Sequence, residues 1–278
     1  MLLNKRRNMK PIILPTAYNY IGIFLTLRCN LNCSYCLNRQ GRFVMPTEMT
    51  GADWITGLSR IETREDLPIT LQGGEPTIHK DFYDIASSLN EKRLDLLTNG
   101  KFNRQIFMGR IYYDIFKRKA PYASIRFSYH KDLNEEHLMD KIGIMQSEGY
   151  SVGVWGLDHV DNTEMKNFCK ANNVDFRIKQ FLDKEHGTYK YPDAINGELK
   201  TVMCKPSELL INPSGKIYRC HADLYAERNH IGHILDDEIN FPDYLACDYY
   251  GECNPCDVKL KTNRLQENGH CSVIIKEC

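Results

Sequence analysis

Residues 20–36 read YIGIFLTLRCNLNCSYC, and this stretch decides the fold that we expect for the chain. Its first half, Tyr20–Leu27, is an apolar run of strand length. The loop that follows places Cys29, Cys33 and Cys36 in the spacing C-x3-C-x2-C. Reactive groups of a parallel barrel lie at the carboxyl ends of its strands, so a strand that runs into a cysteine loop indicates such a site.

Five further strand-like segments follow this first strand, and helix-like segments separate them. We expect strands at residues 67–71, 94–98, 124–129, 151–157 and 175–181. We expect helices at residues 51–62, 81–89, 104–117, 133–147 and 163–172. Strands that alternate with helices form βα units with a parallel sheet. The pattern predicts an α/β fold, a partial (β/α)6 TIM-like barrel, followed by a small cysteine-rich domain with a β-hairpin.

The chain divides into three predicted parts. Residues 1–17 are an N-terminal extension, residues 18–190 the barrel and residues 191–278 the cysteine-rich domain. The turn-rich segment 183–199 serves as the linker. The start is basic and then briefly apolar, but prolines interrupt it, so we do not expect a signal peptide and place the protein in the cytoplasm.

Composition argues against two classes of partner. The chain has 36 basic and 36 acidic residues, a balance that does not favour a nucleic-acid partner. No run of about 18 apolar residues occurs, so we expect no membrane partner. Eleven cysteines in 278 residues indicate either disulfides or metal ligation. Ligation in a reducing compartment is favoured, because a chain of this length can build a large core without disulfides.

The first cysteine motif has the chemistry of an iron–sulfur site. Three thiolates hold three irons of a cubane cluster and leave the fourth iron open, as a reactive metal centre requires. A zinc site is the alternative, but zinc motifs more often combine paired C-x2-C elements that supply four ligands.

The motif resembles the signature of the radical S-adenosylmethionine (radical SAM) superfamily, C-x3-C-x-aromatic-C, with Tyr35 in the aromatic position. Further segments resemble the family in the same order along the chain. The resemblance implies a SAM site formed by the cysteine loop, by the GGEP motif after the second strand, by LLTNG at the end of the third and by IRFSY in the fourth. These segments contribute Tyr35, then Gly73, Gly74, Glu75 and Pro76, then Asn99, then Ser128.

Some of these positions have plainer interpretations. The two glycines of GGEP permit close backbone approach to a ligand and Glu75 offers an acceptor for the SAM ammonium, but GGEP alone is also a common strand-to-helix turn. The acidic residue that the family places after Ser128 is replaced here by Tyr129-His130. Trp155 in the fifth strand suits either an adenine pocket or plain core.

The second group of cysteines resembles the auxiliary-cluster extension called SPASM or twitch. Its supporting features are C-x15-C across a predicted hairpin with an NPSG turn, a later C-x2-C pair, and HIGHILDD at residues 230–237. The resemblance implies one auxiliary [4Fe-4S] cluster, with structural zinc as the alternative. The expected ligands are Cys204, Cys220, Cys253 and Cys256, with Cys247 and Cys271 as spare candidates. Cys169 is expected to be a buried apolar thiol and Cys278 a free one.

The resemblance implies that a [4Fe-4S] cluster cleaves SAM reductively to a 5′-deoxyadenosyl radical that abstracts hydrogen from a small-molecule or peptide substrate. The resemblance further implies that the overall reaction is a net oxidation or a crosslink. It also implies an oxygen-sensitive enzyme that uses a reductant such as flavodoxin or ferredoxin. Two other classes stay open: a non-catalytic iron–sulfur scaffold and a zinc-binding nucleic-acid module. No histidine is assigned a catalytic role, because an ordinary surface or core role is favoured for each of the four candidates: His130, His159, His186 and His221.

Overall fold

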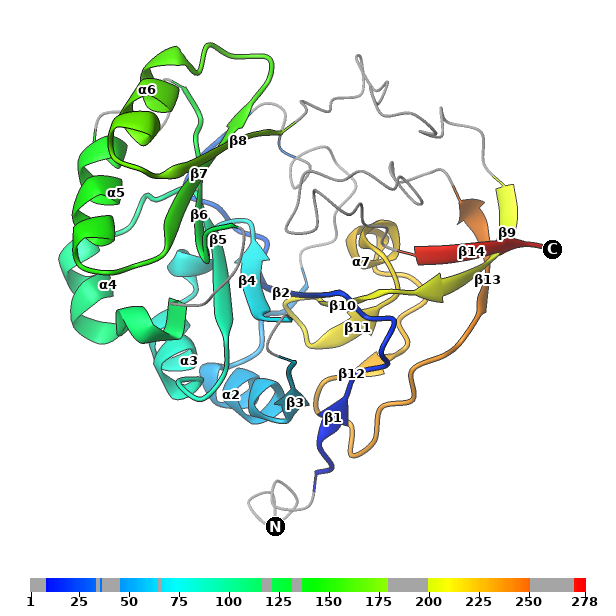
Figure 1. Cartoon of the computed structure of the whole chain (residues 1–278). Helices are drawn as coiled ribbons and strands as arrows, with labels where there is room; N and C mark the ends of the chain where they lie inside the picture. Colours follow the sequence, from blue (N-terminus) through cyan, green and yellow to red (C-terminus); the bar gives the residue numbers. More distant parts are fainter. Residues whose placement is uncertain are drawn as a thin grey trace.

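A computed structural model of the chain describes residues 9–33, 36, 46–64, 67–116, 122–131, 137–179, 200–250 and 273–278. One large sheet dominates these residues (Figure 1). Its nine strands follow the order β12-β11-β10-β2-β4-β5-β6-β7-β8. Consecutive strands from β10 to β8 pair in parallel.

The six predicted strands form the centre of this sheet, so the predicted partial barrel is confirmed. They are β2 (Tyr20–Thr26), β4 (Ile69–Gly73), β5 (Leu94–Thr98), β6 (Ile125–Ser128), β7 (Val152–Leu157) and β8 (Asp175–Lys179). The described strands form an open sheet without a pairing between β8 and β12.

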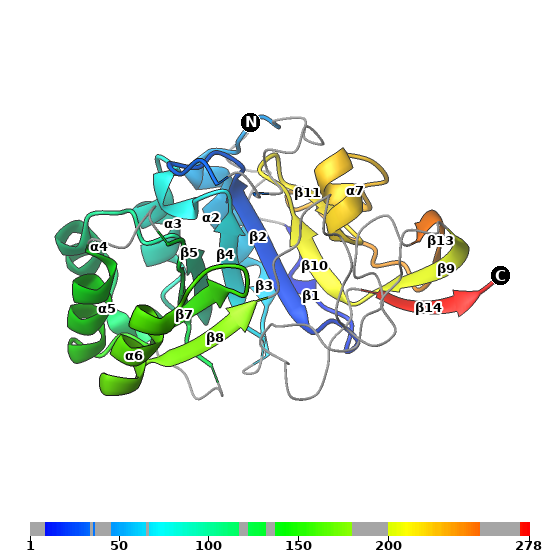
Figure 2. The same cartoon turned by 90° about the horizontal axis from the view of Figure 1, so that it is seen from above.

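Five α-helices follow the predicted helical segments and lie on the outer side of the sheet (Figures 1 and 2). They are α2 (Gly51–Ser59), α3 (Phe82–Ser88), α4 (Arg104–Arg110), α5 (Leu138–Ser147) and α6 (Thr163–Ala171). A single helix over residues 104–117 was wrong: Ile111 adopts an extended conformation, and a short 3-10 helix η4 (Tyr113–Phe116) follows. No helix among the described residues is both long and apolar enough to cross a bilayer.

The two faces of the sheet differ in character because side chains alternate along each strand. Toward the helices the strands present apolar side chains such as Ile23, Leu71 and Phe127, which are fully buried in the main core. The opposite, concave face carries buried polar side chains, including Asp95 on β5 and Arg126 on β6. A polar interior of this kind suits a binding site better than a packed core.

The predicted hairpin is confirmed, and it extends the barrel sheet. Strand β10 (Glu208–Ile211) turns through Gly215, which has φ +84°, into antiparallel β11 (Lys216–Tyr218). On its other side β10 pairs in parallel with β2. Helix α7 (His221–Ala226) then packs over the concave face of β2 and β10, where Leu224 contacts Phe24 and its neighbours.

The remaining strands are short or belong to a second sheet. Strand β12 (Gly232–His233) ends the main sheet, and β1 (Ile12–Ile13) pairs with β3 (Ile61–Glu62). A three-stranded antiparallel sheet contains β13 (Leu245–Tyr250), β9 (Lys200–Pro206) and β14 (Val273–Glu277). It lies at the end of the molecule opposite α5 and α6 (Figure 1). The predicted linker 183–199 lies outside the described residues, and the division at residue 190 stays a prediction.

Candidate functional site

The first cysteine loop begins directly after β2, at the carboxyl edge of the parallel strands. Cys33 is buried, while Cys29 and Cys36 are partly exposed. The Cys36 N–H donates to the Cys33 carbonyl over 3.2 Å. Leu31 N–H lies 3.4 Å from Cys29 Sγ. Tyr35 lies outside the described residues.

The donors of this loop suit an iron–sulfur cluster. Cysteine thiolates are the ligands that hold iron–sulfur clusters in proteins. Within the described ranges no three Cys, His, Asp or Glu side chains converge closely enough to hold a metal ion. The structure therefore places Cys29, Cys33 and Cys36 after β2 without drawing their sulfurs together.

The GGEP loop crosses the start of the cysteine loop at very close range. A Cβ on Gly73 would lie 2.1 Å from the Thr26 carbonyl oxygen, and a Cβ on Gly74 would lie 2.1 Å from the Arg28 carbonyl oxygen. Gly73 also has φ +135°, which disfavours any side chain. Both glycines are thus explained by backbone packing against the cysteine loop, a reason different from the predicted approach to a ligand.

Glu75 is fully buried and accepts four hydrogen bonds from the protein. Its Oε1 accepts from the Thr77 hydroxyl at 2.6 Å, the Thr98 hydroxyl at 2.8 Å and the Thr77 N–H at 3.1 Å. Its Oε2 accepts from the Asn99 N–H at 2.7 Å. Burial raises the pKa of this carboxyl despite the donors. Glu75 therefore ties the ends of β4 and β5 together, and its predicted contact with a SAM ammonium stays a prediction.

Pro76 begins a short 3-10 helix, η3 (Pro76–Ile78), which Glu75 caps through Thr77 N–H. Proline suits this first position because its missing N–H would have no partner in the helix. The GGEP loop is consequently fixed at both ends, by the glycine crossing and by the capped helix.

Asn99 connects this network to the cysteine loop. Its side-chain Nδ2 donates to Asn30 Oδ1 over 2.8 Å and lies 3.5 Å from Cys29 Sγ. The residue itself is only 5% exposed. Glu75 thus holds the Asn99 backbone while the Asn99 amide reaches a cluster-ligand candidate, so three sequence-predicted site residues belong to one hydrogen-bonded chain.

An ion pair that the sequence did not reveal fixes the base of the cysteine loop. Arg28 donates through Nε and Nη2 to the two oxygens of Glu48, at 2.9 and 2.8 Å. Glu48 also contacts the Thr26 hydroxyl. A bidentate arginine–carboxylate pair is directional as well as attractive. No spacing rule links two residues that stand 20 positions apart in a loop, so only the fold shows this pair.

The neighbouring strand ends supply the other predicted positions. Ser128 is partly exposed at the end of β6, and Trp155, opposite it on β7, is 4% exposed. His130 lies two residues after Ser128, and burial, with a contribution from the charges of Lys179 and His159, lowers its pKa to about 4. His221 instead pairs with Glu208, 3.5 Å away, beside α7. His186 lies outside the described residues.

Three cysteines of the C-terminal region gather on one face of the small sheet. Cys204 on β9 and Cys247 on β13 are diagonal neighbours, and a small buried cluster contains both together with Cys220. A hydrogen bond with Cys204 lowers the pKa of Cys247 to about 6. Cys247 was predicted only as a spare. Cys253, Cys256 and Cys271 lie outside the described residues.

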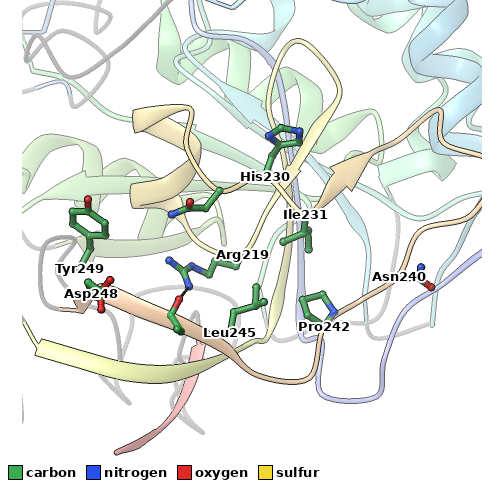
Figure 3. Close-up of a pocket in the computed structure, with 10 residues that line it drawn as sticks. Arg219, His230, Ile231, Asn240, Pro242, Leu245, Asp248 and Tyr249 are labelled. Carbon is green, nitrogen blue, oxygen red and sulfur yellow. Dashed lines mark hydrogen bonds between the residues drawn. The ribbon is translucent and has the colours of Figure 1, made fainter. Parts of the chain in front are cut away.

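A pocket of about 680 Å³ is lined by residues of β13 and of the segment that follows α7 (Figure 3). Arg219, Ala246 and Asp248 line it and flank Cys220 and Cys247 in sequence. Arg219 is 3% exposed and donates to Asp223 Oδ2 at 2.6 Å and to the Ala246 carbonyl at 2.7 Å. This buried guanidinium places positive charge next to the cysteine cluster. Elsewhere, Cys169 is fully buried in α6 and Cys278 is exposed, as predicted.

Comparison with known proteins agrees with this geometry. Residues 23–142 match the model of the Radical SAM superfamily. Molybdenum cofactor biosynthesis protein 1 from Bos taurus is 35% identical over 89 residues, which are 30% of this chain and 14% of that protein. A GTP 3′,8-cyclase from Limosilactobacillus fermentum is 29% identical over 94 residues, which are 31% of this chain and 27% of that protein. Each alignment thus covers less than a third of the relative's length.

Two solved structures share the fold over most of the chain. SuiB from Streptococcus suis, bound to precursor peptide SuiA, has a TM-score of 0.56 and 14% identity, covering 85% of this chain and 65% of that one. The structure of anSMEcpe with AdoMet and a Kp18Cys peptide has a TM-score of 0.54 and 12% identity, covering 78% of each chain. The family match contains the cysteine loop, the GGEP loop, Asn99 and Ser128. Residues 23–142 of this chain are therefore a domain of the radical SAM superfamily.

Proposed function

We propose that this chain is a radical SAM enzyme that binds a [4Fe-4S] cluster through Cys29, Cys33 and Cys36. The observation that carries the proposal is the hydrogen-bonded chain from Glu75 through Asn99 to Cys29, within a domain of this family. A scaffold without chemistry would need a stable fold but no ordered contact between the GGEP loop and a cysteine sulfur.

SAM is proposed to lie over the carboxyl ends of β4, β5 and β6. When bound, the cluster supplies the electron that cleaves SAM to methionine and a 5′-deoxyadenosyl radical, which abstracts hydrogen from the substrate. The protein's own contribution is positioning. Asn99 orients Cys29, Ser128 is placed for the ribose, and Gly73 and Gly74 hold the GGEP loop, with Pro76, against the cysteine loop.

We further propose an auxiliary [4Fe-4S] cluster in the C-terminal region. Cys204 and Cys220 are the hairpin ligands, and Cys253 and Cys256 complete the set. The packing of Cys247 against Cys204 supports Cys247 as a ligand in place of one of that pair, with Cys271 still a spare. A site closed by four thiolates suits electron transfer, so the overall reaction is proposed to be a net oxidation or crosslink.

The substrate is proposed to be a small molecule or a peptide, and the reductant a flavodoxin or ferredoxin. The structural neighbours support a peptide, since two of them hold peptides: SuiA with SuiB, and Kp18Cys with anSMEcpe. The sequence relatives named as GTP 3′,8-cyclases support a small molecule.

The test of the central proposal is the triple replacement of Cys29, Cys33 and Cys36 by Ala. After anaerobic reconstitution, this variant should form no 5′-deoxyadenosine from SAM with dithionite, while it retains iron in the C-terminal region. Cys278→Ala is the matched control, because Cys278 is an exposed thiol far along the chain. Undiminished 5′-deoxyadenosine in the triple variant would refute the proposal.

Iron content tests the auxiliary cluster separately. We expect about eight irons per chain, from two four-iron clusters, and about four in a variant that lacks Cys204 and Cys220. About four irons and one zinc in the wild type would refute the auxiliary cluster and leave the radical SAM proposal intact.

A further inference from the structure

The concave face of the barrel collects positive charge where β6, β7 and β8 meet. Arg126 projects from β6, and Arg177 and Lys179 project from β8, each on the side opposite the apolar core. Trp155 on β7 lies between the two arginines, whose guanidinium carbons are 5.8 and 5.7 Å from its ring centre. Cations on three adjoining positions of one polar face require counter-charges.

Two of the three cations have them within the protein. Arg126 pairs with Asp95 at 2.6 Å, and both side chains are at most 7% exposed. Arg177 pairs with Asp175 at 2.9 Å. Each pair is neutral as a unit, so the two arginines shape the face without leaving net charge on it.

Lys179 is different, because no hydrogen bond or ion pair of its ammonium joins it to another described residue. Burial, and then the charge of Arg126, lowers its pKa to about 8. The nearby His130 adds no counter-charge, since its pKa is lowered and imidazole carries no negative charge. A buried ammonium without a carboxylate is unfavourable unless another group satisfies it.

The position of Lys179 is suited to a ligand. It is the last residue of β8, and it lies opposite Leu157, two residues beyond Trp155, the partner of Ser128. The carboxyl ends of parallel strands meet at one edge, so Lys179 shares the mouth of the barrel with Ser128 and the cysteine loop. The residue is partly exposed, so a ligand at this edge of the sheet can reach it.

The same face contains further polar atoms that lack protein partners. Thr70 Oγ1 on β4 and Gln72 Nε2 at the end of β4 are buried, and neither forms a hydrogen bond with the part of the chain that the structure describes. Buried polar atoms are nearly always paired, with water or ligand where protein does not serve. They indicate that the concave face receives a polar molecule.

We propose that Lys179 binds an oxyanion of the substrate, a carboxylate or a phosphate, at the mouth of the barrel. This inference rests on the proposed function, since it places the anionic group beside the radical site. Arg126 and Arg177, fixed by their own carboxylates, form a rigid wall with Trp155 beside Lys179. The substrate class that follows is an anionic metabolite or a peptide with an acidic side chain or a free carboxyl end.

The test uses the full chain, with inorganic phosphate and acetate as probes. Reductive ¹³C-methylation makes each lysine visible by NMR, and the low pKa of Lys179 separates its titration from those of exposed lysines, near about 10.4. Lys179→Arg assigns the signal. Bound oxyanion should raise the pKa of Lys179, and Lys179→Met should weaken phosphate and acetate binding at least tenfold. Lys170→Met, an exposed lysine of α6, is the matched control and should bind as the wild type does.

Three outcomes would overturn the inference. They are a Lys179 signal that does not respond to either probe, equal probe affinity in Lys179→Met, and a tenfold loss of SAM affinity in Lys179→Met, which would assign the ammonium to the SAM carboxylate. The probe titrations need neither cluster nor SAM. A wild type that fails to cleave SAM but shows the anion response would refute the proposed function and leave the anion site standing.

Discussion

Gly74→Ala tests the contact between the GGEP loop and the cysteine loop. The added Cβ would lie 2.1 Å from the Arg28 carbonyl oxygen and 2.5 Å from that of Leu27, whereas real Cβ contacts below 3.0 Å essentially never occur. The backbone must therefore move by about 0.9 Å, the difference between the first distance and that limit. Both obstacles are main chain, so no side chain can rotate away to relieve them.

Overpacking of this kind destabilises a protein by about 1–3 kcal/mol, and a backbone clash belongs at the upper end of that range. For a chain of this size, the loss corresponds to a melting temperature lower by roughly 6–12 °C. The same shift moves Arg28 and the adjoining Cys29, and it breaks the 2.8 Å hydrogen bond from Gly74 N–H to the Thr26 carbonyl. Formation of 5′-deoxyadenosine should therefore fall by at least tenfold.

Gly109→Ala is the matched control. It makes the same chemical change in α4, where an added Cβ would meet nothing within 4 Å, and alanine favours a helix over glycine by about 0.5–1 kcal/mol. Thermal unfolding followed by circular dichroism, together with the SAM cleavage assay, compares the two variants. If Gly74→Ala melts within 1 °C of Gly109→Ala and cleaves SAM equally well, the crossing of the two loops is not as tight as described.

Three further predictions concern single side chains. Burial raises the pKa of Glu75, so the stability associated with its protonated form is present at low pH and is lost as pH rises through the raised pKa. Glu75→Gln should remove that part of the pH dependence of the melting temperature. Superimposable curves of melting temperature against pH for the wild type and Glu75→Gln would contradict this. Asn99→Leu removes the amide next to Cys29 and should lower the rate of SAM cleavage, with a smaller effect on the melting temperature. A rate of SAM cleavage equal to that of the wild type would show that Asn99 has no positioning role. Iodoacetamide should label Cys278 but not the native Cys169, whose pKa burial raises to about 12; mass spectrometry after digestion decides, and early labelling of Cys169 would show that α6 opens readily.

Local pattern was sufficient to predict the barrel strands and the order of the site motifs. Alternating apolar segments of strand and helix length dictate parallel βα units, and the motifs fall at strand ends because that is where such units expose their loops. The interpretation of Glu75 was less complete. A sequence shows that a carboxylate follows two glycines, but the four donors to it come from Thr77, Thr98 and Asn99. Thr98 ends the next strand and Asn99 directly follows it.

Contacts between distant segments could not be predicted from local pattern. Cys204 and Cys247 meet because β13 pairs with β9 in one particular antiparallel register, and a shift of one residue would place one thiol on the opposite face. Whether Lys179 has a partner among the described residues likewise depends on which side chains share the concave face with it. The sequence alone does not tell which side chains these are. Pair formation across a fold is a property of register and curvature rather than of composition.

The pairing of β10 with β2 has a consequence for how this protein folds and for how it can be dissected. The two strands stand nearly two hundred residues apart in sequence, yet four consecutive residue pairs join them. Contacts between residues so far apart in sequence form slowly, so one edge of β2 is expected to stay unpaired until the C-terminal region has been synthesised. A fragment that ends before residue 200 would leave this apolar seven-residue strand exposed at the border of the sheet. Such an edge invites pairing with other chains. We therefore expect the isolated barrel to aggregate, because β10 of the hairpin no longer covers the edge of β2.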